Sequence, residues 1–150
     1  MIALIQRVSE AEVRVAGSDG STQVAGAIGR GVLALIGVRR EDGERDVERL
    51  LERLLTYRIF PDDTGRMNLS VRDVSGGLLL VPQFTLAADT DKGTRASLHP
   101  AAEPATAQAL FTQLLERARA AYAPVSAGVF GAHMAVSLVN DGPVTFWLET

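Results

Sequence analysis

Residues 78–89 read Leu-Leu-Leu-Val-Pro-Gln-Phe-Thr-Leu-Ala-Ala-Asp, and the other elements of the chain can be arranged around this stretch. Four aliphatic residues after Gly76-Gly77 predict a buried strand, because short apolar runs bounded by turn residues are typical of covered strands. Pro82 has no N–H for a sheet ladder, so the strand must end, bulge or lie at an edge there. Residues 83–85 then place an amide, an aromatic ring and a hydroxyl at the rim of the sheet. Either a rigid site or an ordinary loop fits this pattern.

The composition indicates one soluble domain over residues 1–150, with 47% apolar and 22% charged residues. A net charge of −3 disfavours a broad grip on a nucleic-acid backbone, but it leaves contact with the end of an RNA open. The chain has no cysteine, which excludes disulfides, thiol nucleophiles and thiolate metal sites and fits a cytoplasmic location. We find neither a signal peptide nor an apolar run near the roughly 20 residues that span a bilayer, so no membrane partner is expected.

The first third of the chain is predicted to be extended. Apolar residues over 2–15 have strand spacing, with Ser9-Glu10 as a break. A turn cluster at 17–21 predicts a hairpin whose second strand covers 24–28. Residues 32–38 form a strongly apolar strand.

Two helices are predicted. Asp42 is expected to cap a helix that begins near Gly43 and continues to Arg58, with apolar residues at the 3.6-residue period. Pro104 suits the first position of the second helix, and Pro124 ends it.

The C-terminal part is predicted to hold strands at 125–129, 134–138 and 144–148, with a turn at Asn140-Asp141-Gly142-Pro143. The order of strands and helices predicts an α/β fold, a single domain with two helices packed on a sheet.

Few side chains stand out as catalytic. Thr85, His133 and Asp89 could in principle form a nucleophile, base and orienting group, although their spacing gives no support for a triad. With two separated histidines and no cysteine, we expect no metal site. The polar segment 89–104 is long for a loop, and its Lys92 and Arg95 could meet phosphates.

Gly142-Pro143 is the more specific feature. An X-Pro bond adopts the cis form at modest cost, and a cis bond turns two successive carbonyls to one side. Such a rigid backbone pair could sense the hand of a ligand's α-carbon by sterics alone. A plain turn between two strands is the alternative.

Several short motifs are spread over the whole chain in a fixed order. They are Ile5-Gln6-Arg7-Val8, Arg58-Ile59-Phe60, Gly65-Arg66-Met67-Asn68-Leu69-Ser70-Val71, Gln83-Phe84-Thr85-Leu86, Ala88-Asp89, Lys92-Gly93-Thr94-Arg95, Phe130-Gly131-Ala132 and Asn140-Asp141-Gly142-Pro143-Val144-Thr145. Through these motifs the sequence resembles the D-aminoacyl-tRNA deacylases, also called D-tyrosyl-tRNA deacylases. The resemblance implies a three-layer β/β/α arrangement with both helices on one face.

The resemblance also implies an activity. Members of this family hydrolyse the ester that links a D-amino acid, or glycine mischarged on tRNA-Ala, to the 3′-terminal adenosine of tRNA. They are homodimers without a cofactor, and their partner is the 3′ acceptor end of aminoacyl-tRNA rather than DNA. A Gly-cisPro pair, here Gly142-Pro143, reaches into the other subunit's pocket and blocks L-amino acids.

The resemblance assigns site residues in this numbering. Pro82 and the catalytic segment Gln83, Phe84 and Thr85 match the family's site floor, where the N–H groups of Phe84 and Thr85 bind the ester carbonyl as an oxyanion hole would. The 2′-hydroxyl of the RNA is implied to assist hydrolysis. The residues implied near the adenosine are Met67, Asn68, Phe130, Gly131 and Ala132.

Pro82 is a departure, because the family usually has serine before Gln83. A related branch of tRNA deacylases also has Pro-Gln there and rejects L-substrates less strictly. Two rival hypotheses stay open: a noncatalytic module that binds RNA ends or nucleotides, and a conventional esterase in which Thr85 is the nucleophile.

Overall fold

The computed structural model describes residues 1–17 and 20–150, so Ser18 and Asp19 of the expected hairpin turn lie outside the described residues. The elements are, in chain order, β1 (Ile2–Ala16), β2 (Thr22–Ile28), β3 (Gly31–Gly37), α1 (Glu44–Thr56), β4 (Phe60–Pro61), β5 (Met67–Leu69), β6 (Gly77–Pro82), the 3-10 turn η1 (Phe84–Ala87), α2 (Pro104–Ala121), β7 (Val125–Ala127) and β8 (Met134–Glu149).

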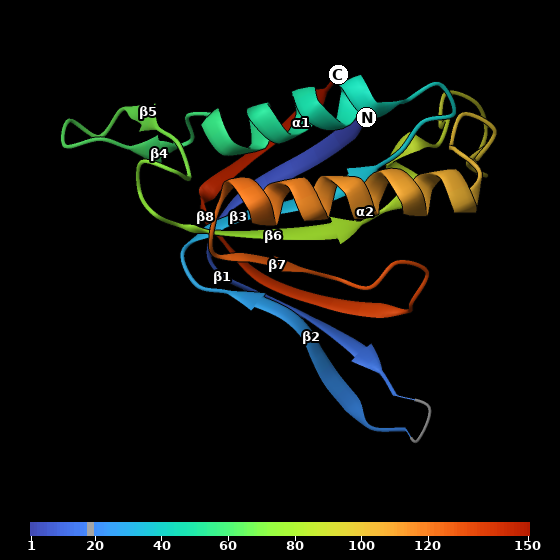
Figure 1. Ribbon diagram of the computed structural model, residues 1–150, viewed down its shortest axis with the longest axis horizontal. Helices are drawn as coiled ribbons and strands as arrows, with labels where there is room; N and C mark the ends of the chain where they lie inside the picture. The colour runs from blue at the N-terminus through green and yellow to red at the C-terminus, as the bar shows by residue number, and fades with distance from the viewer. Residues whose placement is uncertain (18–19) are drawn as a thin grey trace.

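One sheet holds most of the strands, in the order β2-β1-β3-β6-β7, and β8 pairs with the long strand β1. The pairs β3–β6 and β6–β7 are parallel, whereas β1 runs antiparallel to β2, β3 and β8. Helices α1 and α2 lie side by side on one face of this sheet (Figure 1). The predicted α/β domain with two helices on one face is confirmed.

Side chains of the central strands alternate between two cores. On β3, Val32, Ala34 and Ile36 pack toward the helices, whereas Leu33 faces the opposite core. The same alternation on β6 sends Leu78 and Leu80 to the helices and Leu79 and Val81 to the other side. The second core also takes residues from β1, β2 and β8, so the sheet folds over on itself into two layers.

Strand β1 changes face at a bulge. Ala3 and Ile5 pack in the helix-side core, but Ala11 and Val13, which are also odd-numbered, pack in the other core. The register against β8 shifts between Val8 and Glu10, so one extra residue is inserted there, and one inserted residue reverses the faces of all that follow. The break predicted at Ser9-Glu10 is therefore a bulge within one strand.

The predicted turn at Asn140-Asp141-Gly142-Pro143 is wrong as a connection between two strands. β8 runs unbroken through it, because the residues on both sides pair with β1: Asn140 pairs with Val8 and Thr145 with Gln6. The four residues between these pairs oppose one residue of β1 and form an outward excursion in the middle of β8. The strand predicted at 125–129 is also shorter, since β7 ends at Ala127.

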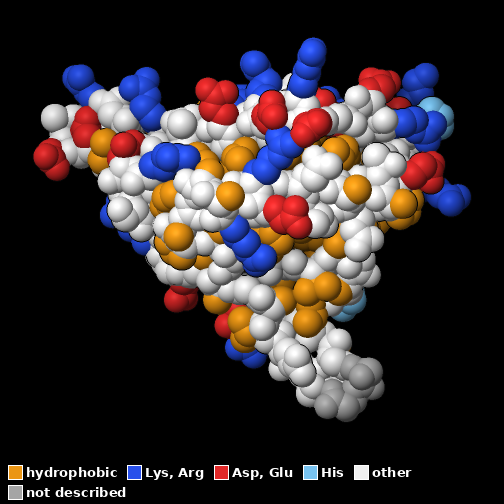
Figure 2. Space-filling view, viewed as in Figure 1, with side chains coloured by type: hydrophobic (Ala, Val, Ile, Leu, Met, Phe, Trp, Pro, Cys, Tyr) orange, Lys and Arg blue, Asp and Glu red, His pale blue; other side chains and the backbone are white. Residues whose placement is uncertain are grey.

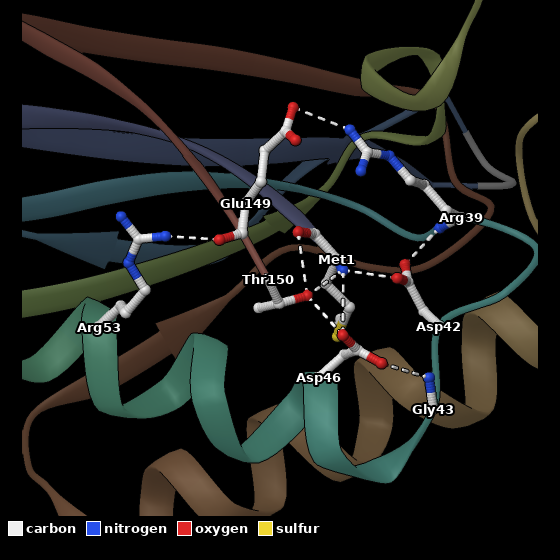
Figure 3. A network of polar contacts seen from close by, with 8 residues as sticks. All are labelled: Met1, Arg39, Asp42, Gly43, Asp46, Arg53, Glu149 and Thr150. Atoms are coloured by element: carbon white, nitrogen blue, oxygen red, sulfur yellow. Dashed lines mark hydrogen bonds and ion pairs between the residues drawn. The ribbon is translucent and has the colours of Figure 1, made fainter.

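The start of α1 differs from the prediction as well. Asp42 is not its cap: its carboxylate accepts from the Met1 ammonium at 2.6 Å and from the Arg39 N–H at 2.5 Å. Gly43 is the N-cap, and its N–H donates to the Asp46 carboxylate at 2.9 Å. Thr150 joins this network through hydrogen bonds to Met1 and Asp46, which ties both chain ends to the start of α1 (Figure 3).

Helix α1 ends at Thr56 because Tyr57 is already extended, whereas α2 begins at Pro104 as predicted. The outer side of the helical layer is charged: Arg, Asp and Glu side chains crowd the part of the surface over α1 (Figure 2). Arg117 of α2 forms ion pairs with Glu44 and Glu48 of α1, which joins the two helices. No described helix has the length and apolar character needed to cross a membrane.

Strands β4 and β5 form a hairpin, residues 60–69, which we call the arm because it projects from one end of the sheet (Figure 1). Phe60 anchors it in the core under Arg30, whose guanidinium lies 5.4 Å from the ring centroid. Asp62 shapes its turn by accepting hydrogen bonds from Thr64, from the Arg66 N–H at 3.1 Å and from the Asn68 side chain at 2.7 Å. These donors lower the Asp62 pKa to about 2.

We expect Asp42→Asn to lower the free energy of unfolding by about 3 kcal/mol, because removing one partner of a buried ion pair leaves the other uncompensated. The Met1 and Asp42 side chains are 0% and 8% exposed, so water gives little help. Urea unfolding followed by circular dichroism measures the change. The neighbouring exposed Glu41→Gln is the control, and equal stability of the two variants would contradict the prediction.

Asp62 is expected to titrate near pH 2. Because its folded pKa lies below the ordinary 3.8, its contribution to arm stability is present above pH 3.8 and is lost as the pH falls toward 2. Carboxyl ¹³C NMR would follow this titration. Asn68→Ala removes one donor and should raise the Asp62 pKa toward its usual value; an unchanged pKa would show that Asn68 does not bind the carboxylate in solution.

Candidate active site

A hollow of about 440 Å³ lies where β6 ends. Its floor is formed by residues 81–84 at the end of β6, and its walls come from α2 and from the turn that leads into β8. The lining residues are Val81, Pro82, Gln83, Phe84, Ala102, Pro104, Ala107, Phe130, Gly131, Ala132, His133, Met134 and Val136. The structure therefore brings together Pro82, Gln83 and Phe84 with the predicted adenosine residues 130–132.

Pro82 ends β6 without removing a hydrogen bond from the sheet. The N–H of Gln83 donates to the carbonyl of Ile36 in β3 at 2.7 Å, so the nitrogen of Pro82 points to the opposite side. On that side the pairing with β7 stops at Leu80. The missing N–H thus falls beyond the last residue of β6 that pairs with β7, where a proline costs the ladder no hydrogen bond.

The turn after Gln83 leaves two backbone donors without a partner in the described part of the chain, and one of them belongs to Phe84, which lines the hollow. Phe84 and Thr85 begin η1, and the first N–H groups of a helical turn have no acceptor within it. Within the described residues, neither N–H has a backbone partner outside the turn either. A close approach holds the turn in place: a Cβ on Gly37 would lie 2.9 Å from the Leu86 Cβ and 3.3 Å from the Gln83 carbonyl.

The side chains of this segment are available to a ligand. Phe84 is 57% exposed, which leaves an apolar ring face at the entrance of the hollow. The Gln83 amide donates to the Thr85 hydroxyl at 2.6 Å, so the hydroxyl acts as an acceptor there and keeps its own proton to donate.

The Thr85, His133 and Asp89 triad is not assembled. Across the described residues no hydrogen bond or ion pair joins any two of them. His133 lines the hollow, but Thr85 is bonded to Gln83, and the Asp89 carboxylate accepts the Asp91 N–H at 2.9 Å. The site is thus built from backbone groups and an apolar wall, with few ionisable side chains.

Lys92 and Arg95 are exposed in the loop closed by the backbone bridge between Asp89 and Ser97. Neither forms an ion pair within the described part of the chain. Both cations are therefore available to an anionic ligand.

Sequence reasoning missed the contributions of α2 and His133 to the hollow. Pro104 and Ala107 lie on the first turns of α2 and form one wall. The sequence placed Pro104 at a helix start, but no local signal tells which strand end a helix start will face.

The Gly142-Pro143 bond is cis, and polar contacts hold the excursion that contains it. Arg7 of β1 donates to the Asp141 carbonyl at 3.0 Å and to the Ile59 carbonyl at 2.7 Å. The Asn140 side chain accepts the Val144 N–H at 2.7 Å. Gly142 has φ +133°, a value that L side chains rarely adopt, so glycine is needed here.

Gly142-Pro143 and the hollow lie at opposite ends of the sheet. The pairings place Asn140 beside Val8 and Val8 beside Gly31, which pairs with Gly77 at the start of β6. β6 is 6 residues long, so about 17 Å of strand separates this level from Pro82. The arm with Met67 and Asn68 projects from the same end as Gly142-Pro143, away from the hollow (Figure 1).

Comparison with known proteins gives a consistent result. A family model described as D-Tyr-tRNA(Tyr) deacylase matches residues 4–149. The D-aminoacyl-tRNA deacylase of Thioalkalivibrio sulfidiphilus (strain HL-EbGR7) is 67% identical over 149 residues, which cover 99% of this chain and 97% of the relative. The enzyme of the same name from Alkalilimnicola ehrlichii (strain ATCC BAA-1101 / DSM 17681 / MLHE-1) is 64% identical and covers 99% and 96%.

Two solved structures also match the fold of the whole chain. A structure named c-Myc DNA Unwinding Element Binding Protein matches with a TM-score of 0.91 and 37% identity, covering 100% of this chain and 99% of that one. The structure of a probable eukaryotic D-amino acid tRNA deacylase has a TM-score of 0.85, covers 99% and 98%, and is 17% identical, which speaks for the fold alone. With the whole chain matched in sequence and in structure, the protein belongs to the D-Tyr-tRNA(Tyr) deacylase family and is a hydrolase.

Proposed function

We propose that the protein removes D-amino acids from tRNA by hydrolysing the ester at the 3′-terminal adenosine, and that glycine mischarged on tRNA-Ala is a second substrate. The observation that carries this proposal is the hollow at the end of β6, which Phe84 lines together with an apolar wall. The N–H of Phe84 and that of Thr85, the next residue in the chain, have no backbone partner outside the turn in the described residues. Such donors suit an ester carbonyl whose oxygen becomes negative during hydrolysis.

The chemistry needs little from side chains. Water attacks the ester carbon, and the carbonyl oxygen becomes an oxyanion that accepts from the N–H groups of Phe84 and Thr85. The 2′-hydroxyl of the terminal ribose lies beside the ester and assists proton transfer. The bond to the 3′-oxygen then breaks, this oxygen takes up a proton, and the free amino acid leaves. The absence of an assembled Thr85 triad supports this route over a threonine nucleophile.

Two subunits are proposed to build each site. Within one chain, Gly142-Pro143 cannot reach the hollow, because the length of β6 separates them. An antiparallel side-by-side homodimer would bring the Gly142-Pro143 end of each subunit to the hollow of the other. There the two backbone residues would exclude the side chain of an L-amino acid.

The outer surface of β8 supports this dimer. Large apolar side chains stand out along it: Val136 is 36% exposed, Val139 50% and Trp147 47%. They lie on the strand that connects the hollow at Met134 with the Gly142-Pro143 excursion. Exposed apolar side chains on the strand that carries both half-sites are what an isologous contact would cover.

The tRNA is proposed to be held only by its acceptor end, in the cytoplasm. The adenosine would lie against residues 130–132 and Phe84. Lys92 and Arg95, which are without ion pairs in the described residues, would meet phosphates of the single-stranded end. A net charge of −3 agrees with such a small footprint and predicts a shallow salt dependence.

D-Tyr-tRNA is expected to be hydrolysed at least about 100-fold faster than L-Tyr-tRNA, equivalent to about 2.7 kcal/mol of selective exclusion. The measurement is the release of labelled amino acid from matched substrates by purified protein. Equal rates on both would contradict chiral selection. Binding of both without release would instead favour the noncatalytic RNA-end module.

Thr85→Ala is expected to keep its rate within about threefold, because its backbone N–H and not its hydroxyl is proposed to act. Replacing the terminal adenosine by 2′-deoxyadenosine should lower the rate by at least about 100-fold, the usual range for a lost proton-transfer group. Single-turnover deacylation measures both changes. Inactive Thr85→Ala with a native circular dichroism spectrum would favour the threonine nucleophile.

A further inference from the structure

The connection between β7 and β8 is a short turn that includes residues 130–132 of the hollow's wall. The N–H of Gly128 donates to the Leu80 carbonyl at 2.9 Å, which ties the start of the turn to β6. The N–H of Ala132 donates to the Val129 carbonyl at 3.3 Å, which closes the turn on itself. The shape of this wall therefore depends on how the turn is held at its other side, toward β8.

The sulfur of Met134 joins the turn to β8. The N–H of Val129 donates to the Met134 Sδ, and 3.3 Å separates the nitrogen from the sulfur. Met134 is the first residue of β8 and pairs with Val15 of β1, so its backbone is fixed in the sheet. Its side chain is partly exposed and lines the hollow. A thioether thus links the hollow's wall to the sheet.

The sulfur also has a close neighbour in the backbone of Gly128. A Cβ built on Gly128 would lie 2.8 Å from the Met134 Sδ, and 3.5 Å from the Pro82 Cδ and the Val81 Cγ1. Glycine at this position therefore leaves the room that the sulfur occupies beside the end of β6. An atom added to the sulfur on this side would force the turn or the strand to shift.

Methionines are the oxidisable sulfur groups of this chain, which has three of them and no cysteine. Met1 is 0% exposed, and Met67 lies on the arm with 46% exposure. Of the described residues that line the hollow, Met134 alone contains sulfur. A small oxidant that enters the hollow therefore meets one thioether.

We propose that Met134 is a reversible oxidation site that controls the shape of the hollow. The oxidant is a hydroperoxide: the sulfur attacks one peroxide oxygen, an S–O bond forms and the O–O bond breaks. The proton of the transferred oxygen passes to the leaving oxygen, so hydrogen peroxide leaves as water. The sulfur loses the two electrons that the peroxide gains. A dithiol reductant reverses the step by returning two electrons, and the oxygen leaves as water.

Oxidation changes both contacts of the sulfur. The new oxygen needs space beside Gly128, where the sulfur already fills the room. A sulfoxide is polar and accepts hydrogen bonds more strongly than a thioether, so the N–H of Val129 is drawn to the new oxygen. Residues 130–132 move with Val129, because they lie between it and Met134 in the chain. The expected loss of deacylation rests on the proposed function, whereas the movement of the turn does not.

Peroxide treatment followed by peptide mass analysis tests the proposal. Protein treated with hydrogen peroxide for increasing times is assayed for oxygen on each methionine and for hydrolysis of D-Tyr-tRNA. The rate should fall at least about tenfold in step with oxygen at Met134, and methionine sulfoxide reductases with dithiothreitol should restore it. Met134→Leu should keep most of its own untreated rate, whereas Met67→Leu should lose the same fraction as the unmodified protein.

A second substitution imitates the oxidised state. Met134→Gln places a polar acceptor near the position of the sulfur and should lower the rate at least about tenfold without peroxide. Met134→Leu conserves volume and serves as its apolar counterpart. Equal peroxide sensitivity of Met134→Leu and the unmodified protein would overturn the proposal. So would an unchanged rate with Met134 oxidised, or a Met134 that stays reduced while Met67 is oxidised. Circular dichroism spectra show whether the variants are folded.

The amide resonance of Val129 in ¹H–¹⁵N NMR gives a readout that needs no activity. It should shift when Met134 is oxidised and return after reduction, whereas the amide of Thr64, which donates to Asp62 in the arm, should not move. A Val129 resonance that stays in place with oxygen on Met134 would overturn this inference. An unmodified protein that leaves D-Tyr-tRNA intact would instead overturn the proposed function, and the NMR result would still decide whether the sulfur controls the turn.

Discussion

Strand β1 is the constraint on which the rest of the structure depends. It pairs with β3 through its first half, with β2 through its second half and with β8 along its other edge. The bulge at Ser9 reverses its faces, so one strand supplies the helix-side core first and the opposite core afterwards. Without this reversal, Ala11 and Val13 would point to the same side of the sheet as Ala3 and Ile5, and the second core would lose them.

The same strand positions both half-sites. The N-terminal half of β1 pairs with β3. The carbonyl of Ile36, near the end of β3, accepts the Gln83 N–H and so fixes the residue that precedes η1. At its middle, Arg7 holds the excursion of β8 and the root of the arm. A site made of backbone donors needs such support, since it has no side-chain rotamers to adjust. In the proposed mechanism, the rigid placement of backbone groups takes the place of ionisable side chains as the source of selectivity.

The sequence allowed the local features to be predicted and the non-local ones only in part. The apolar runs of β3 and β6 and the start of α2 follow from periodicity and from glycine or proline chemistry within a few residues. The turn expected at 140–143 failed because pairing with β1, distant in sequence, holds both flanks in one strand. The prediction that Asp42 caps α1 was wrong because its carboxylate accepts a hydrogen bond from the Met1 ammonium. A local sequence pattern cannot include a residue so distant in the chain. The family motifs supplied site residues that periodicity alone did not.

Pro82 shows how a backbone site tolerates a change in its side chains. A serine at this position would offer a hydroxyl and an N–H, but the N–H would point to the side where β7 has already ended. Neither group supplies the donors of Phe84 and Thr85, which are set by the Gln83 bond to Ile36 and by the close approach of Gly37. Proline also fixes φ just before the donors, which limits the freedom of the turn. Proline in place of the serine expected from the resemblance therefore leaves the proposed carbonyl-binding donors in place.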